Sequence, residues 1–172
     1  MKKKALLIAI AMLIAASTST FALGLGGGYR FGAGEIGGTS LLGDAFFSVK
    51  FDEKSPLLGI SGWATSTYGR LGLTADWWFF NNNIKGRWNW YLGAGPYVST
   101  AFSLYSSYLN IGVGARLPIG FNWFFVDNRL ELFLEAAPAI GLGIKLDNYS
   151  STDLFCVDWS VLSSIGVRWW IN

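Results

Sequence analysis

Apolar residues alternate with small or polar residues over the fifteen positions 109–123, LNIGVGARLPIGFNW. Every odd position of this stretch is apolar, whereas the even positions carry glycine, asparagine, Arg116 and one proline. Successive side chains of a strand point to opposite faces, so this alternation predicts a β-strand. A strand of this length exceeds the usual five or six residues or so, but it suits a tilted strand that crosses a bilayer. The pattern therefore predicts an apolar face toward lipid and a polar face toward a lumen.

The same alternation recurs in six further stretches, which are separated by turns rich in glycine, asparagine or proline, and residues 57–64 are expected to form an eighth strand although apolar residues occupy both parities there. The expected strands are residues 23–34, 43–51, 57–64, 70–80, 88–98, 109–123, 130–142 and 157–171. Residues 81–87 are expected to form an asparagine-rich turn. Four loops are expected at the opposite end, at roughly 35–42, 65–69, 100–107 and 143–156. Eight strands is the smallest number found in bacterial outer-membrane barrels.

The N-terminal residues resemble a secretory signal peptide. Lys2, Lys3 and Lys4 precede an apolar segment at 5–16, and small or polar residues then lead to an expected cleavage after Ala22. The apolar segment is too short to span a membrane as a helix. The predicted fold class is therefore all-β: an eight-stranded antiparallel up-and-down transmembrane β-barrel at 23–172, preceded by a cleaved helical signal peptide at 1–22.

The composition is unusually apolar, with 52% hydrophobic and 17% aromatic residues but only 14% charged residues. No run of eighteen uncharged apolar residues follows the leader, which excludes a transmembrane helix as the source of this hydrophobicity. A soluble β-sandwich or lipocalin-like barrel remains as the alternative to a membrane barrel. The faces opposite the apolar ones are rich in glycine and poor in charge, which favours the membrane barrel.

Charge and cysteine content exclude two further classes. The formal net charge of +2 becomes −1 once the three leader lysines are removed, because ten basic residues then face eleven acidic ones. The sequence therefore predicts no binding to nucleic acid. Cys156 is the single cysteine of the chain, so no internal disulfide is expected.

Aromatic residues gather near the strand ends that lie on the same side as the N-terminus of the barrel. Tryptophan and tyrosine favour the membrane–water interface, so this clustering predicts an aromatic girdle. The expected girdle residues are Trp77, Trp88, Trp90, Trp123 and Trp169.

The polar faces predict a charged lumen, whose interior in an eight-stranded barrel is just wide enough for side chains to fill. Buried charges need partners. Counting residues from the turn at 127–128 places Glu131 level with Arg168, and Glu135 level with Arg116. These two cross-strand ion pairs are expected, with Arg30 and Asp76 in the same network. Inward aromatic residues would narrow the lumen further, and the candidates are Trp78, Phe80, Tyr91 and Tyr97.

Enzymatic activity is not expected. Small outer-membrane barrels that act as lipases, acyl-modifying enzymes or proteases rely on histidine, and this chain contains none. Mechanisms that pair serine or aspartate with histidine are therefore excluded, as are zinc sites of the His/Cys type. No cofactor is expected.

Four sequence segments resemble those of a known family: LTADWWFFN, WYLGAGPYV, GARLPIGFNWFF and LELFLEAAPAIG. With the predicted strands, the chain resembles the small eight-stranded outer-membrane barrels of the OmpA, OmpX and OmpW type. More narrowly, the four segments are similar to an uncharacterised family of outer-membrane barrels. The resemblance implies an integral outer-membrane protein with no established activity. Such barrels usually end on an aromatic residue, whereas this chain ends on Asn172.

Two functional interpretations follow. The favoured one is a structural or surface-interaction barrel whose lumen is plugged by paired charges, and the alternative is a porin-like channel for small solutes. The expected location is the outer membrane. The expected partners are outer-membrane lipids and, during export, periplasmic chaperones and the barrel-insertion machinery, while the sequence names no surface ligand.

Overall fold

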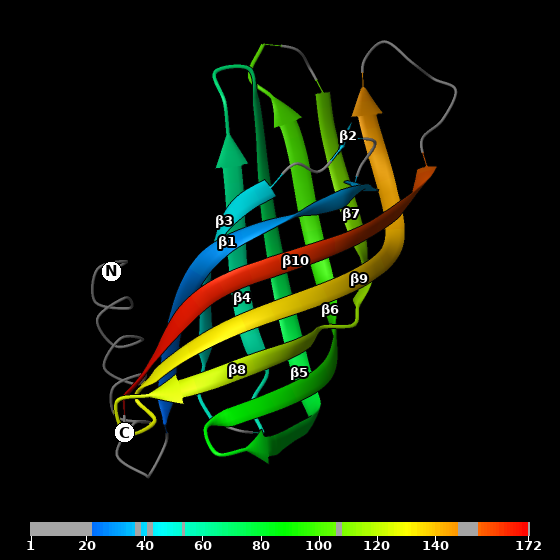
Figure 1. The fold of residues 1–172 in the computed structure, drawn as a ribbon. Helices are drawn as coiled ribbons and strands as arrows, with labels where there is room; N and C mark the ends of the chain where they lie inside the picture. The colour runs from blue at the N-terminus through cyan, green and yellow to red at the C-terminus, as the bar shows by residue number, and fades with distance from the viewer. Residues whose placement is uncertain are drawn as a thin grey trace, which may run out of the picture.

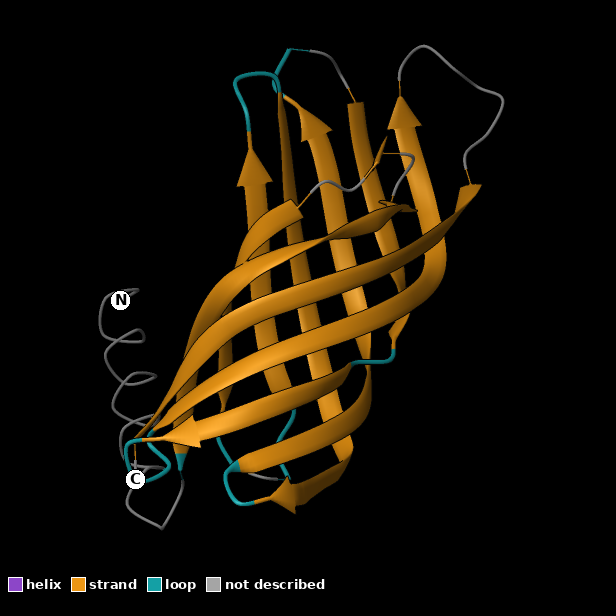
Figure 2. Ribbon diagram, viewed as in Figure 1, coloured by secondary structure: helices purple, strands orange, loops and turns teal. Residues whose placement is uncertain are grey.

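The computed structural model describes residues 22–36, 39–40, 43–52, 54–105, 108–147 and 155–171. The expected signal peptide lies outside these ranges apart from Ala22, and so does Asn172. Regular secondary structure within the described ranges consists of β-strands (Figure 2). No helix in this part of the chain is long and apolar enough to cross a membrane.

The strands form one antiparallel sheet that closes on itself. Its strands are β1 (Leu23–Ile36), β2 (Thr39–Ser40), β3 (Gly43–Lys50), β4 (Leu57–Ala64), β5 (Tyr68–Lys85), β6 (Trp88–Ser103), β7 (Tyr108–Arg116), β8 (Ile119–Phe125), β9 (Leu130–Asp147) and β10 (Phe155–Ile171). The last strand, β10, pairs with β1 and closes the ring (Figure 1). Because β7 and β8 share one place between β6 and β9, and β2 only flanks β1, the ring has eight positions. The predicted eight-stranded barrel is confirmed.

The strand expected at 109–123 is interrupted, and this part of the prediction was wrong. The chain leaves the ladder at Leu117 and Pro118 and resumes as β8. Proline has no N–H to donate, but its carbonyl accepts a hydrogen bond from the Gly93 N–H at 2.8 Å. The Leu117 N–H donates to the Pro138 carbonyl at 2.9 Å. These two bonds hold the sheet together across the break, and the Pro118 ring is fully buried.

The asparagine-rich segment 81–87 is mainly strand, which corrects the predicted turn. β5 continues to Lys85, and the turn is reduced to Gly86, with φ 62°, and Arg87. Asparagine favours turns in general, but here Asn81 and Asn83 lie opposite Tyr91 and Asn89 of β6. Tertiary pairing therefore overrides the local preference of the segment.

A register shift between Trp78 and Phe80 changes which side chains face inward. One extra residue in β5 leaves Phe79 and Phe80 both on the outer surface, where Phe80 is 51% exposed. Phe80 therefore does not narrow the lumen, contrary to expectation. Trp78 stays inside and stacks on Tyr91, with ring centroids 4.2 Å apart.

Several strands extend beyond their predicted ends on the side away from the N-terminus. β6 reaches Ser103 and β9 reaches Asp147, so the loops expected at 100–107 and 143–156 begin several residues later. Parts of these loops, at 106–107 and 148–154, lie outside the described residues. The strands cross the barrel wall obliquely (Figure 1), as closure of a sheet requires.

The distribution of side chains is the reverse of that in a soluble protein. Large apolar side chains cover the outside, as for Ile140, which is 66% exposed. Charged side chains lie inside, as for Glu131 and Asp158, both 0% exposed. Among the described residues, the large apolar or aromatic side chains that are buried are Leu57, Tyr91, Tyr97, Phe133 and Leu162.

Candidate functional site

Among the described residues, five cations and five carboxylates of the lumen are buried or nearly buried. The five cations are Arg30, Lys50, Arg70, Arg116 and Arg168, and the five carboxylates are Asp44, Asp76, Glu131, Glu135 and Asp158. Buried charges are tolerated when they are paired and hydrogen-bonded. No group of His, Cys, Asp and Glu in this part of the chain is arranged to hold a metal ion.

The layer nearest the N-terminal end is centred on Glu131. Arg168 lies directly opposite it in the β9–β10 ladder, and its Nη1 donates to both carboxylate oxygens at 2.8 Å. Asn122 and Trp170 donate to the same carboxylate at 3.0 and 2.7 Å. The Arg168 guanidinium also lies over the Phe133 ring, at 4.9 Å. The structure thus brings together the first pair expected from the sequence.

The middle layer is centred on Arg116, which contacts two carboxylates. Its Nη2 donates to Glu135 Oε1, and its Nε lies 3.2 Å from Asp76 Oδ1. The Tyr91 hydroxyl donates to the other Glu135 oxygen at 2.8 Å. Asp76 is on β5 and Glu135 is on β9, which lie on the two sides of β7 in the ring. Arg116 of β7 therefore links strands on both sides of its own strand.

The third layer is centred on Asp44. Arg30 lies opposite Asp44 in the β1–β3 ladder and forms a two-point contact with it, at 2.8 and 3.0 Å. Arg70 reaches the same carboxylate from β5 at 3.0 Å. Arg30 therefore pairs with Asp44 rather than with Asp76. Asp76 lies beside Arg116 instead, a contact that the sequence pattern did not predict.

Two small cavities separate these layers. One of about 40 Å³ is lined by residues of the Asp44 layer and by Arg116. Another of about 20 Å³ lies where the Arg116 and Arg168 side chains both contribute to the lining. A cavity needs roughly 10–15 Å³ for each water molecule. These spaces therefore suit a few waters, and the charged side chains fill most of the middle of the lumen.

The expected girdle tryptophans lie at the N-terminal end of the barrel. Trp77, Trp88 and Trp169 are exposed on the outer surface. Trp123 stacks on Trp88 with ring centroids 4.7 Å apart, and Trp90 stacks on Phe80 at 6.3 Å. The structure therefore places outward-facing indole rings around this end.

The hydrogen bonds from Tyr91, Asn122 and Trp170 were missed by the sequence reasoning. Tyr91 and Asn122 occupy inward positions of the alternating pattern, so their direction could be inferred. Their particular partners could not, because those partners depend on how far the side chains reach across the lumen. Trp170 was not among the expected girdle or lumen residues, although its indole N–H donates to Glu131.

Replacing Tyr91 with phenylalanine is expected to lower the free energy of unfolding by about 1.5–3 kcal/mol. The change removes the hydroxyl that donates to the buried Glu135 carboxylate and keeps the ring that stacks on Trp78. Denaturant unfolding of the refolded barrel, followed by tryptophan fluorescence, measures the difference. A loss below about 0.5 kcal/mol would show that this hydrogen bond contributes little.

Comparison with a solved structure supports the fold. The chain is similar to the crystal structure of neisserial surface protein A (NspA), with a TM-score of 0.56 and 14% sequence identity. The match covers 88% of this chain and 97% of NspA. At this identity the similarity concerns the fold, which is that of the small outer-membrane β-barrels.

Comparison of the sequence identifies the family. No curated protein matches the chain. Residues 10–169 match the family described as "Protein of unknown function (DUF3996)". The match extends over nearly the whole chain, including every strand of the barrel except the last residues of β10. The chain therefore belongs to the DUF3996 family.

Proposed function

We propose that this protein is an integral outer-membrane β-barrel with a structural or surface-interaction role, and that paired charges close its lumen. The observation that carries the proposal is the distribution of side chains between the two faces of the wall. Large apolar residues cover the outside, and most of the charged residues of the described strands are buried inside. An outer surface of this kind is stable against lipid, whereas water would favour the opposite arrangement.

The direction of insertion follows from the connections between strands. At the N-terminal end, β5 and β6 are joined by two residues and β8 and β9 by four. Outer-membrane barrels place their short turns in the periplasm, so this end is assigned to the periplasmic side. Export through the signal peptide, and insertion by periplasmic chaperones and the insertion machinery, belong to the same proposal.

The closed lumen is supported by the three charge layers. Arg116 contacts carboxylates on β5 and β9, and Asp44 accepts hydrogen bonds from arginines on β1 and β5. A hydrated ion that passed these layers would have to displace buried, hydrogen-bonded pairs, which is energetically costly. The surface-interaction part of the proposal draws on the fold shared with NspA, which is by its name a surface protein.

A porin-like channel for small solutes is the second candidate. The observation that favours it is the pair of small cavities that Arg116 and Arg30 both help to line. Movement of the Arg116 side chain would join these cavities into a narrow path. This candidate differs from the closed barrel in one measurable property, which is conductance.

Single-channel recording from leader-free protein, refolded and inserted into planar bilayers, is expected to show no discrete conductance steps. The reason is the occupation of the lumen by the layers around Arg116 and Asp44. Folding is checked first by heat-modifiable migration on gels, so that an absence of conductance cannot be caused by unfolded protein. Reproducible steps that change in the Glu135→Gln variant would contradict closure and support the channel.

A further inference from the structure

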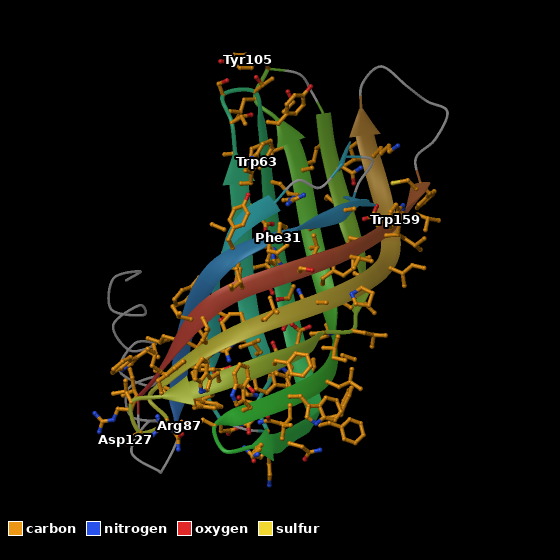
Figure 3. The ribbon with its side chains drawn as sticks, viewed as in Figure 1. Phe31, Trp63, Arg87, Tyr105, Asp127 and Trp159 are labelled. Atoms are coloured by element: carbon orange, nitrogen blue, oxygen red, sulfur yellow. The ribbon has the colours of Figure 1, made fainter. Side chains whose placement is uncertain are left out.

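An open vestibule lies at the N-terminal end of the lumen, below the Glu131 layer. Its volume is about 370 Å³, which falls within the roughly 300–1,000 Å³ typical of small-molecule sites. Its lining residues include Lys50, Trp78, Asn81, Arg87 and Asn128. Lys50 and Trp78 also face the lumen, whereas Asn81, Arg87 and Asn128 belong to none of the three charge layers. Figure 3 labels Arg87 and Asp127 at the end of the barrel where Figure 1 marks the C-terminus.

The vestibule is lined by hydrogen-bonding groups and by positive charge. Its described lining residues include two cations, Lys50 and Arg87, and four asparagines, Asn81, Asn83, Asn89 and Asn128, but no carboxylate. Asp127 lies in the adjacent turn and is not part of the lining. The electrostatic preference of the vestibule is therefore for a ligand that carries negative charge.

Parts of the wall are held in place before any ligand arrives. Asn83 Nδ2 donates to Asn89 Oδ1 at 2.6 Å and to the Gly86 carbonyl at 2.8 Å. Lys50 Nζ donates to the Ser55 carbonyl at 2.7 Å and lies 4.6 Å from the centre of the Trp78 ring. The Arg87 carbonyl accepts a hydrogen bond from the Phe124 N–H at 3.1 Å, which fixes the backbone of the turn. A preorganised wall lowers the entropic cost of binding.

The exposed groups define the chemistry of the ligand. The guanidinium of Arg87 matches the planar, two-oxygen geometry of a carboxylate. The amides of Asn81 and Asn128 each present a donor and an acceptor, which match a peptide group. We propose that this vestibule binds the free carboxyl end of a short, uncharged peptide, with the carboxylate at Arg87 and the preceding peptide groups along the asparagines. The access of this site to the periplasm rests on the proposed function, but the binding itself does not.

The proposal is tested with two peptides that differ only at the C-terminus, which is a free carboxyl group in one and an amide in the other. Leader-free protein in zwitterionic detergent micelles is titrated with acetyl-Ala-Ala and with its C-terminal amide, and binding is followed by calorimetry and ligand-observed NMR. The acid is expected to bind about tenfold or more tightly than the amide, because only the acid forms a charge-assisted bond with Arg87. Equal affinities, or no binding of the acid, would overturn the proposal.

Two variants locate the site. Arg87→Gln removes one of the two cations that line the vestibule, and it is expected to weaken binding of the acid about tenfold while binding of the amide stays the same. Arg129→Gln removes an exposed cation from the neighbouring turn, outside the lining, and is expected to leave both affinities unchanged. Equal effects of the two substitutions would place the binding elsewhere, and efficient displacement by inorganic phosphate would indicate a general oxyanion site instead. Because binding is measured in micelles, a negative result leaves the membrane location and the closed lumen untouched.

Discussion

Replacing Arg116 with methionine is expected to lower the free energy of unfolding by at least about 3–5 kcal/mol, the largest single-residue effect in the lumen. Arg116 contacts both Asp76 and Glu135. Its loss leaves two buried carboxylates without their shared cation, and one of them keeps only the hydrogen bonds from Tyr91 and Ser164. Denaturant unfolding of the refolded barrel in micelles measures the change.

Two further variants separate this effect from a general response to arginine removal. Arg129→Met removes an exposed arginine and is expected to change the free energy of unfolding by no more than about 0.5 kcal/mol. Neutralising the carboxylates in the Arg116→Met background, with Asp76→Asn and Glu135→Gln, is expected to restore much of the lost stability. If the single variant and the Arg129 control behaved alike, Arg116 would have no special role in the lumen.

Replacing Gly28 with alanine is expected to be the second most damaging change, because it separates the strands that close the ring. A Cβ atom at this position would lie 2.1 Å from the Ile165 carbonyl oxygen and 2.6 Å from Gly166 Cα. Both are backbone atoms of β10, so relief requires a shift of the strand rather than of a side chain. Overpacking in a well-packed interior costs about 1–3 kcal/mol. Because the backbone of β10 must also move, the Gly28→Ala substitution is expected to lower the free energy of unfolding by about 3 kcal/mol or more.

The neighbouring glycine provides a matched control. A Cβ atom at Gly27 would come no closer than 3.3 Å to any atom, the nearest being the Phe46 carbonyl oxygen. Gly27→Ala is therefore expected to fold to nearly the same extent as the natural chain. The fraction of heat-modifiable, folded protein after refolding, together with the unfolding midpoint, compares the two variants. Similar losses at both positions would mean that the contact with β10 is not the cause.

Alternation along the chain predicted the barrel because each strand separates lipid-facing from lumen-facing residues. The Glu131–Arg168 contact could be located because these residues lie directly opposite in neighbouring strands, so counting from one turn is sufficient. The contacts of Arg70 with Asp44 and of Arg116 with Asp76 cross the lumen or pass a neighbouring strand. Their formation depends on the width of the barrel and the reach of arginine, which local spacing does not contain.

The errors in the strands also have local causes. Asparagines at 81–83 have the composition of a turn, although they pair with β6. The register shift at 78–80 reverses the inward and outward positions after it, and nothing in the pattern of WWFF marks the extra residue. The break at Pro118 was hidden by an alternation that continues on both sides of it.

The arrangement of the lumen charges has a consequence for the order of assembly. Arg30 with Asp44, and Arg168 with Glu131, join neighbouring strands of single hairpins. Each of these two ion pairs can therefore form within its own hairpin before the ring is complete. The contacts of Asp44 with Arg70 and of Asp76 with Arg116 join strands that are not consecutive in the chain. These contacts form only as the wall curves, so they stabilise the curved sheet relative to separate hairpins.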